Sequence, residues 1–264
     1  MVKLYDNWCQ SQPTVDGKKT LWRLVERERG RDFALRELPS RVLNHYVSDE
    51  EIAAIVELLE YPEAARSLCK LLPSKAIGRS GDLGEILAVE FVEERLGHRV
   101  PVRRLRGKDH REMAMRGEDV IGVALDRKNR LKLLKGEAKS AKALSKATVE
   151  KARMRLDGDH GRPAAHSLLF VARQLVKRKD AGSKALGKQI LRAASNRTMP
   201  KRRLAHLLFT LSGNPATRII QDDFDASDGS REQHVANLRV SDHGKFVDSI
   251  YEETCQEAGS IGDR

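Results

Sequence analysis

The sequence predicts an α/β fold with a mixed central sheet flanked by helices. The chain has 264 residues, of which 40% are hydrophobic and 33% charged, so it can bury one sizeable core with at most a small appendage. Across residues 82–172 the spacing of apolar residues predicts a helix, a strand, a hairpin, a second helix and a further strand. That order is typical of α/β proteins.

The first third of the chain predicts a small, mainly helical region. Apolar residues recur at helical spacing between residues 49 and 72, with one interruption, which indicates two short helices. The Gly-Arg-Ser-Gly stretch at residues 78–81 then predicts a hinge. We therefore expect a helical N-terminal region at residues 1–78, a candidate surface for docking a partner, and a larger domain at residues 79–264.

A helix, a strand and a hairpin are predicted after the hinge. Asp82 and Glu85 have the spacing of a capping box, which predicts the start of a helix that Gly97 ends. A short strand at residues 100–102 follows. Two apolar runs on either side of a hydrophilic turn then predict a β-hairpin, with its strands at residues 120–125 and 131–139.

The remaining elements alternate between helix and strand. The apolar patterns predict helices at about residues 141–156, 183–194 and 243–257, and strands at residues 167–172 and 235–240. Residues 204–211 fit either type. Together with the hairpin, these strands would complete the mixed sheet.

The register of the predicted hairpin brings three ionisable residues together. If Asp126 pairs with Arg130 across a three-residue loop, Asp119 lies opposite Glu137; a two-residue loop would place it opposite the next residue along. Side chains alternate along a strand, so Glu137 and Lys139 share one face. Either register places two carboxylates and a lysine at one end of the hairpin.

These three residues suit the hydrolysis of a phosphodiester. Asp119 and Glu137 offer the oxygen ligands that Mg²⁺ (or Mn²⁺) takes, and a bound metal polarises the phosphate and lowers the pKa of water. Lys139 would stabilise developing charge or position the attacking water. Glu85 has two interpretations, as a member of the capping box or as a catalytic residue that positions metal or water. A Glu-x-Lys motif alone is common on exposed strands, so the inference depends on the whole set.

The residues around this set resemble known nucleases. An apolar strand that ends in Glu-x-Lys, with an Asp on its hairpin partner and a Glu on a preceding helix, is the layout of the PD-(D/E)xK nucleases. Four runs are more specific: Gly84-Glu85, Val100-Pro101-Val102, Gly117-Glu118-Asp119-Val120-Ile121-Gly122 and Gly136-Glu137-Ala138-Lys139-Ser140. They resemble the HamA family, the nuclease subunits of the bacterial Hachiman anti-phage defence system. The chain departs from the general motif at Glu118, where the motif opens with Pro.

The resemblance covers residues 80–172 best and the rest of the chain more loosely. It implies a restriction-endonuclease-like core, metal-dependent cleavage of DNA, and a helicase partner, HamB, that supplies the ATPase. Asp119, Glu137 and Lys139 would be the catalytic positions, and Glu85 matches the acid on the helix. Two alternatives stay open: a non-catalytic subunit that binds nucleic acid or docks a helicase, and a restriction or repair endonuclease that acts alone.

Positive charge is concentrated in one segment of the chain. The formal net charge is +11, and residues 166–220 contain 12 Lys and Arg but only one acidic residue. A surface of one sign suits a polyanion, so we expect DNA as a partner. Only two aromatic residues lie in this segment, which argues against base stacking as its mode of binding. The residues predicted to make non-specific phosphate contacts are Lys177, Arg178, Lys201 and Arg202.

Cysteine usage and hydropathy indicate the compartment. Cys9, Cys69 and Cys255 are far apart and form no CxxC pair, so we expect reduced thiols in a cytoplasmic protein. No apolar stretch approaches the roughly 20 residues that a membrane span needs. The first ten residues also lack the apolar core of a signal peptide. No membrane association is therefore expected.

Overall fold

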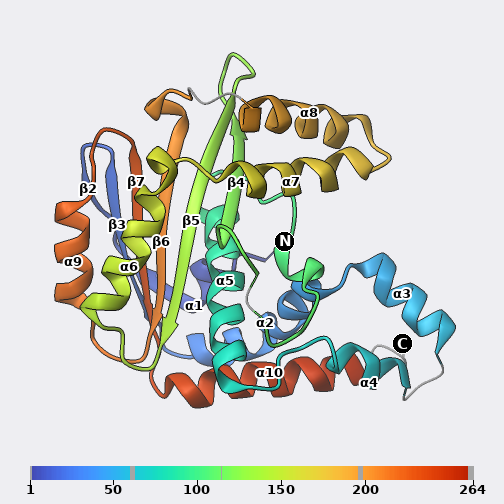
Figure 1. Cartoon of the computed structure of the whole chain (residues 1–264). Coiled ribbons are helices and arrows are strands. Elements are labelled where there is room, and N and C mark those ends of the chain that lie inside the picture. The colour runs from blue at the N-terminus through green and yellow to red at the C-terminus, as the bar shows by residue number, and fades with distance from the viewer. Residues whose placement is uncertain (1, 60–62, 114, 196–198, 261–264) are drawn as a thin grey trace.

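Seven strands form one mixed sheet at the centre of the molecule (Figure 1). The computed structural model describes residues 2–59, 63–113, 115–195 and 199–260. The strands are β1 (Cys9–Ser11), β2 (Thr14–Asp16), β3 (Lys19–Glu26), β4 (Val120–Leu125), β5 (Leu131–Ala141), β6 (Leu204–Ser212) and β7 (Glu232–Arg239). Their order is β1-β3-β7-β6-β5-β4, with β2 also paired to β3. The four central strands, β3, β7, β6 and β5, run parallel, and the other three run antiparallel to their neighbours.

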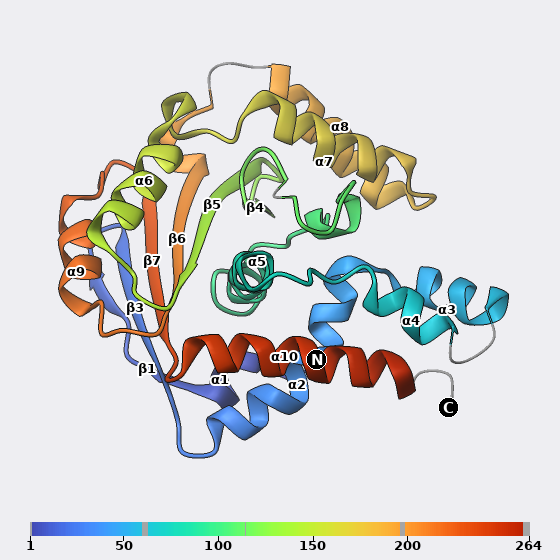
Figure 2. The ribbon, with the colours of Figure 1, turned by 60° about the horizontal axis from the view of Figure 1, so that its bottom comes forward.

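Helices cover both faces of the sheet (Figures 1 and 2). The helices are α1 (Leu4–Trp8), α2 (Gly30–Tyr46), α3 (Asp49–Leu58), α4 (Glu63–Cys69), α5 (Ala76–Arg95), α6 (Lys146–Asp157), α7 (Ala165–Lys177), α8 (Ala181–Ser195), α9 (Thr217–Ala226) and α10 (His243–Ser260). The largest apolar cluster packs α1, α2, α5 and α10 on one face. The other face is covered by α6 and α9 at one end and by α7 and α8 beside the hairpin. Within the described ranges, no helix is both long and apolar enough to span a membrane.

The structure confirms the predicted hairpin and its register. Val120 pairs with Gly136, and the Asp126 N–H donates to the carbonyl oxygen of Arg130 across the three-residue loop. The predicted helices that correspond to α3, α4, α6, α8 and α10 are also present, as is β7. Residues 204–211, which fitted either type, lie in β6, where every residue is buried. The mixed α/β fold is therefore as predicted.

Two predicted strands are wrong. Residues 167–172 lie in α7, because its buried residues, such as Leu168 and Leu175, recur at helical spacing along one face. Within six residues, that pattern cannot be distinguished from a buried strand. Residues 100–102 form no regular strand, and an isolated bridge links the preceding residue, Arg99, to β4.

The predicted hinge is also wrong. α5 begins at Ala76 and continues without a break through the Gly-Arg-Ser-Gly stretch, because the helix is held by its packing and not by local propensity alone. Asp82 therefore lies inside a helix and does not cap it, and its carboxylate accepts a hydrogen bond of 2.6 Å from the buried Tyr46 hydroxyl. This removes the capping-box interpretation of Glu85.

The N-terminal region shares its core with the rest of the chain. β3 pairs along its length with β7, and the Trp8 ring lies 5.5 Å from the Phe246 ring of α10, centroid to centroid. Leu21 and Leu24 of β3 are both buried, although charged neighbours hide this strand in the sequence. Residues 1–78 therefore contribute strands to the central sheet and side chains to the shared core, while the division at residue 78 and a docking role for the N-terminal helices stay predictions.

Leu24→Ala tests whether β3 belongs to the same cooperative unit as the site. Leu24 is 1% exposed, so truncation should cost about 2–5 kcal/mol of unfolding free energy. Its neighbour Val25 is 45% exposed, and Val25→Ala should cost less than about 1 kcal/mol. Urea unfolding of both variants measures the difference. A main transition that Leu24→Ala leaves unmoved would contradict the shared core.

Candidate active site

Asp119 closes the end of the β4–β5 hairpin with its side chain. β4 begins at the next residue, whereas β5 continues five residues beyond Gly136, the last residue paired with β4. The Asp119 carboxylate accepts the Ala138 N–H at 2.8 Å. The Asp119 side chain thus accepts a hydrogen bond that a neighbouring strand would otherwise accept. The bond holds the Asp119 carboxylate beside the C-terminal end of β5.

Lys139 links the two hairpin carboxylates. Its Nζ lies 3.0 Å from Glu137 Oε2 and 3.7 Å from Asp119 Oδ2. Glu137 and Lys139 share one face of β5, as the alternation of the strand requires. The structure therefore brings together the three residues that the hairpin register placed in proximity.

Glu85 reaches the same place from α5, on the other face of the sheet. The preceding residue, Gly84, allows close packing of the helix on β5, because a Cβ there would lie 3.1 Å from the Ser140 Cβ. An Arg104 nitrogen lies between the two carboxylates, 4.0 Å from Glu85 Oε2 and 3.9 Å from Asp119 Oδ1. All four predicted catalytic residues thus meet at one site.

Burial and mutual repulsion raise the pKa of two of these acids. Removal from water, reinforced by the Asp119 carboxylate, raises the pKa of Glu85 to about 8. The Glu137 side chain is 3% exposed, and the same two causes raise its pKa, against the opposing effect of Lys139 and Arg155. The site therefore favours a nearby positive charge.

Glu85, Asp119 and Lys139 line an open cleft of about 490 Å³. The first turns of α5 and α10 and the end of β5 form its walls. Ser140 Oγ lies 2.8 Å from Ser80 Oγ and 2.9 Å from His243 Nε2, so hydrogen bonds connect these three elements. In open α/β sheets ligands bind outside the carboxyl ends of the strands, and this cleft has that location.

Two basic residues of the site were not predicted. Arg104 donates to the backbone carbonyls of Glu118 and Arg116, which holds its guanidinium beside the acids. Arg155 of α6 lies 3.6 Å from Glu137 Oε2, although its side chain is 65% exposed. The sequence does contain the Arg103-Arg104-Leu105-Arg106 run, but nothing in its spacing indicates which arginine turns toward the acids.

The structure does not bring the four predicted phosphate-binding residues to the acids. Lys177 and Arg178 end α7, at the tip that points away from the sheet (Figure 1). Lys201 and Arg202 precede β6, whose first residue pairs with Leu133 of β5. That is six residues before Lys139, or roughly 20 Å along the strand. Lys201 is also engaged by Asp228, at 3.5 Å.

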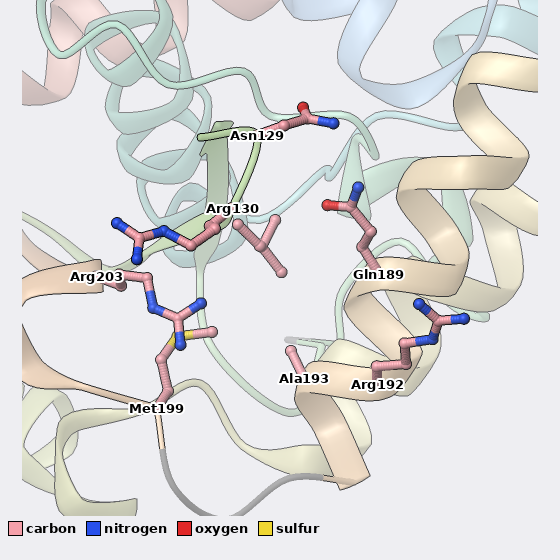
Figure 3. Close-up of a pocket in the computed structure, with 8 residues that line it drawn as sticks. Asn129, Arg130, Gln189, Arg192, Ala193, Met199 and Arg203 are labelled. Carbon is pink, nitrogen blue, oxygen red and sulfur yellow. The ribbon is translucent and has the colours of Figure 1, made fainter. Parts of the chain in front are cut away.

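A basic hollow lies at the opposite end of the hairpin, beside its turn. Figure 3 shows Arg130 and Arg203 on one side of it, and Gln189 and Arg192 on the other. Its volume is about 310 Å³. Positive charge from residues 166–220 therefore gathers beside the hairpin turn, at the opposite end of β5 from the acids.

The donor set at the acids fits a hard divalent cation. Asp119 and Glu137 supply carboxylate oxygens, and their repulsion is offset by any cation between them. Mg²⁺ commonly takes one or two protein carboxylates and keeps several waters. Among the described residues no group of three or more His, Cys, Asp or Glu side chains is arranged to hold a metal ion.

Comparison with known proteins places the chain in a family. A family model described as HamA matches residues 3–254. The chain belongs to the HamA family. The Hachiman protein HamA of Bacillus cereus is 23% identical over 252 residues, which cover 93% of this chain and 88% of that protein. The similarity therefore extends over the N-terminal strands as well as the residues of the cleft.

Glu85→Gln tests the electrostatics of the cleft without any ligand. The folded chain retains the Glu85 proton up to about pH 8, whereas the unfolded chain releases it near pH 4.5, so ionisation penalises the folded state as pH rises between these values. The variant should therefore gain stability over the parent by roughly 3 kcal/mol between pH 5 and pH 8. Urea unfolding in a chelator measures this, with Glu150→Gln on the exposed side of α6 as the control. A gain that does not change with pH would contradict the buried acid.

Proposed function

We propose that the chain is a metal-dependent nuclease that hydrolyses DNA phosphodiester bonds. The observation that carries the proposal is the meeting of Asp119, Glu137 and Lys139 at the carboxyl end of β5, with Glu85 facing them from α5. Phosphodiester hydrolysis needs ligands for a metal and a cation near the phosphate. The carboxylates of Asp119 and Glu137 provide the ligands, and Lys139 provides the cation. Glu85 adds an acid from α5. On this proposal the sheet and α5 form a restriction-endonuclease-like core.

Each residue has a role that its position supports. Asp119 and Glu137 would hold Mg²⁺ or Mn²⁺, which when bound polarises the phosphate and supplies hydroxide near neutral pH. Lys139, 3.0 Å from Glu137, faces the charge that develops on the phosphate oxygens. Glu85, with its raised pKa, can hold a proton and orient water at the cleft. Arg104 adds a fixed positive charge beside Asp119.

The biological setting follows from family membership. The Bacillus cereus relative is a Hachiman protein, and Hachiman is an anti-phage defence system. We infer that this chain is the effector of such a system and that a helicase partner, HamB, provides the ATPase. A stand-alone restriction or repair endonuclease would share the site but would cleave fully without that partner.

A non-catalytic nucleic-acid-binding subunit is the second candidate. It is favoured by one observation: Arg104 and Lys139 already lie within 4.0 Å of the acids and offset part of their charge. Such a protein would bind DNA without binding Mg²⁺ or Mn²⁺. Calorimetry separates the two functions, because a nuclease should bind the metal and Asp119→Asn should abolish that binding.

Removal of the site lysine and glutamate tests the nuclease. Glu137→Ala with Lys139→Ala should lower the rate of DNA cleavage by at least about 100-fold, because a metal ligand and a transition-state cation are both lost. The assay uses the full chain, alone and together with its co-expressed helicase, with Mg²⁺ or Mn²⁺. The control is Lys132→Met, which should leave the rate unchanged. Lys132 is a partly exposed residue at the start of β5, seven residues before Lys139. A double variant that stays fully active would rule out this site.

Exposed basic residues on α6 continue the positive surface beside the cleft. Lys151 and Arg155 form the wall of a hollow that Lys139 also lines. We infer that they hold the phosphates next to the scissile bond, and that the more distant Lys177, Arg178, Lys201 and Arg202 add weaker, sequence-independent contacts farther along the nucleic acid.

Lys151→Glu tests this path. Loss of one phosphate contact should weaken DNA binding and reduce the slope of log affinity against log salt by about 1. Lys70→Glu makes the same charge change at an exposed residue directly after α4, outside the path, and should leave the slope unchanged. Titrations of a labelled duplex at several salt concentrations give both slopes. Equal slopes for the parent and Lys151→Glu would remove α6 from the interface.

A further inference from the structure

A separate cavity of about 460 Å³ lies next to the acid site. It is bounded by the segment that follows α5 and by the first half of α7, which lie next to each other in Figure 2. Its volume is in the range of pockets that hold small organic ligands. Of the residues that have a role in the proposed reaction, only Arg104 lines this cavity. The proposed reaction therefore does not explain why the cavity is there.

Arg104 joins this cavity to the acids. Its side chain lines the cavity, and its guanidinium lies 3.9 Å from the Asp119 carboxylate. Ile121, the second residue of β4, also lines the cavity and follows Asp119 by two residues. A group bound here would therefore be the immediate neighbour of the reacting phosphate.

The lining combines apolar and cationic groups. Phe170 is half-buried, and together with Ile121 and Met115 it provides an apolar wall. Arg104 and Arg116 contribute positive charge, the Lys108 ammonium is paired with the buried Asp82 carboxylate, and Asp109 is the one acid among the described lining residues. An apolar surface with a cationic rim suits a nucleobase attached to a phosphate.

A buried hydroxyl in the lining lacks a partner. Ser167 is 8% exposed, and its Oγ has no hydrogen-bond partner in the described structure. A buried polar group without a partner costs free energy, and such a group in a native protein calls for an explanation. A hydroxyl can donate to or accept from the edge of any base.

We propose that this cavity receives the base of an unpaired nucleotide next to the scissile phosphate. Phe170 contacts the face of the base, and Ser167 bonds its edge. A base stacked in a duplex cannot enter a cavity of this kind without leaving the stack, so the strand is unpaired, frayed or flipped at that position. The inference rests on the proposed nuclease function and specifies its substrate. It also gives a role to one of the two aromatics of residues 166–220, whose scarcity argued against base recognition.

The test compares two strands that differ only in their bases. The full chain carrying Glu137→Gln, in a chelator, is titrated with a single-stranded DNA 12-mer and with an abasic strand of equal length and charge. Because stacking on one aromatic contributes about 1–3 kcal/mol, the parent should prefer the base-containing strand by at least about fivefold. Phe170→Ala and Ser167→Ala should reduce the preference, and Val176→Ala, on α7 outside the cavity, should keep it.

Gly107→Leu provides an occlusion variant that does not disturb the core. Gly107 is exposed, and a Cβ there would lie 3.4 Å from Phe170 Cζ, an ordinary contact, so a larger side chain would fill the mouth of the cavity. This variant should lose the preference for bases while binding the abasic strand as the parent does. No preference in the parent, or a preference that survives Gly107→Leu, would overturn the inference.

The outcome is independent of cleavage. Binding in a chelator needs neither metal nor turnover, so a chain that prefers bases but does not cleave DNA would contradict the nuclease alone. A chain that cleaves DNA but binds both strands equally would contradict the cavity alone.

Discussion

Repulsion between carboxylates at the end of β5 is the constraint around which the site is arranged. β4 starts one residue after Asp119, and the Asp119 carboxylate continues the ladder by accepting the Ala138 N–H. The hairpin register then holds Glu137 beside it, and α5 holds Glu85. Like charges in a buried site are unfavourable unless cations accompany them. Lys139 and Arg104 supply part of that charge, and on the proposed function a divalent metal would supply the rest.

The fold brings these groups together from segments that are far apart in the sequence. α5 approaches β5 closely at Gly84, so an acid on the α5 face of the sheet meets a lysine and an acid whose side chains leave the strand on the other face. Groups from the two faces can meet here because the edge strand β4 begins only at Val120, so that β5 has no described strand partner on this side after Gly136. The short β4 is therefore as important to the site as the acids themselves.

Positive charge surrounds the acids without filling the site. Arg104 and Arg155 approach from opposite sides, one held by backbone carbonyls and the other largely exposed. The basic hollow at the hairpin turn and the cavity beside α7 lie on the same side of the sheet as α6. A nucleic acid bound to this side would therefore meet positive charge along its length and acids at one point, the place of the proposed metal.

The sequence by itself determined the hairpin, its register and the proximity of Asp119, Glu137 and Lys139, because a short turn and the two-residue period of a strand are local properties. It also indicated the mixed sheet. Only the tertiary structure decided that α5 passes through the supposed hinge, that β3 joins the sheet, that residues 167–172 are helical, and that Arg104 faces the acids. Each of these depends on packing between distant segments, which can override local propensity and leaves no mark in the spacing of neighbouring residues.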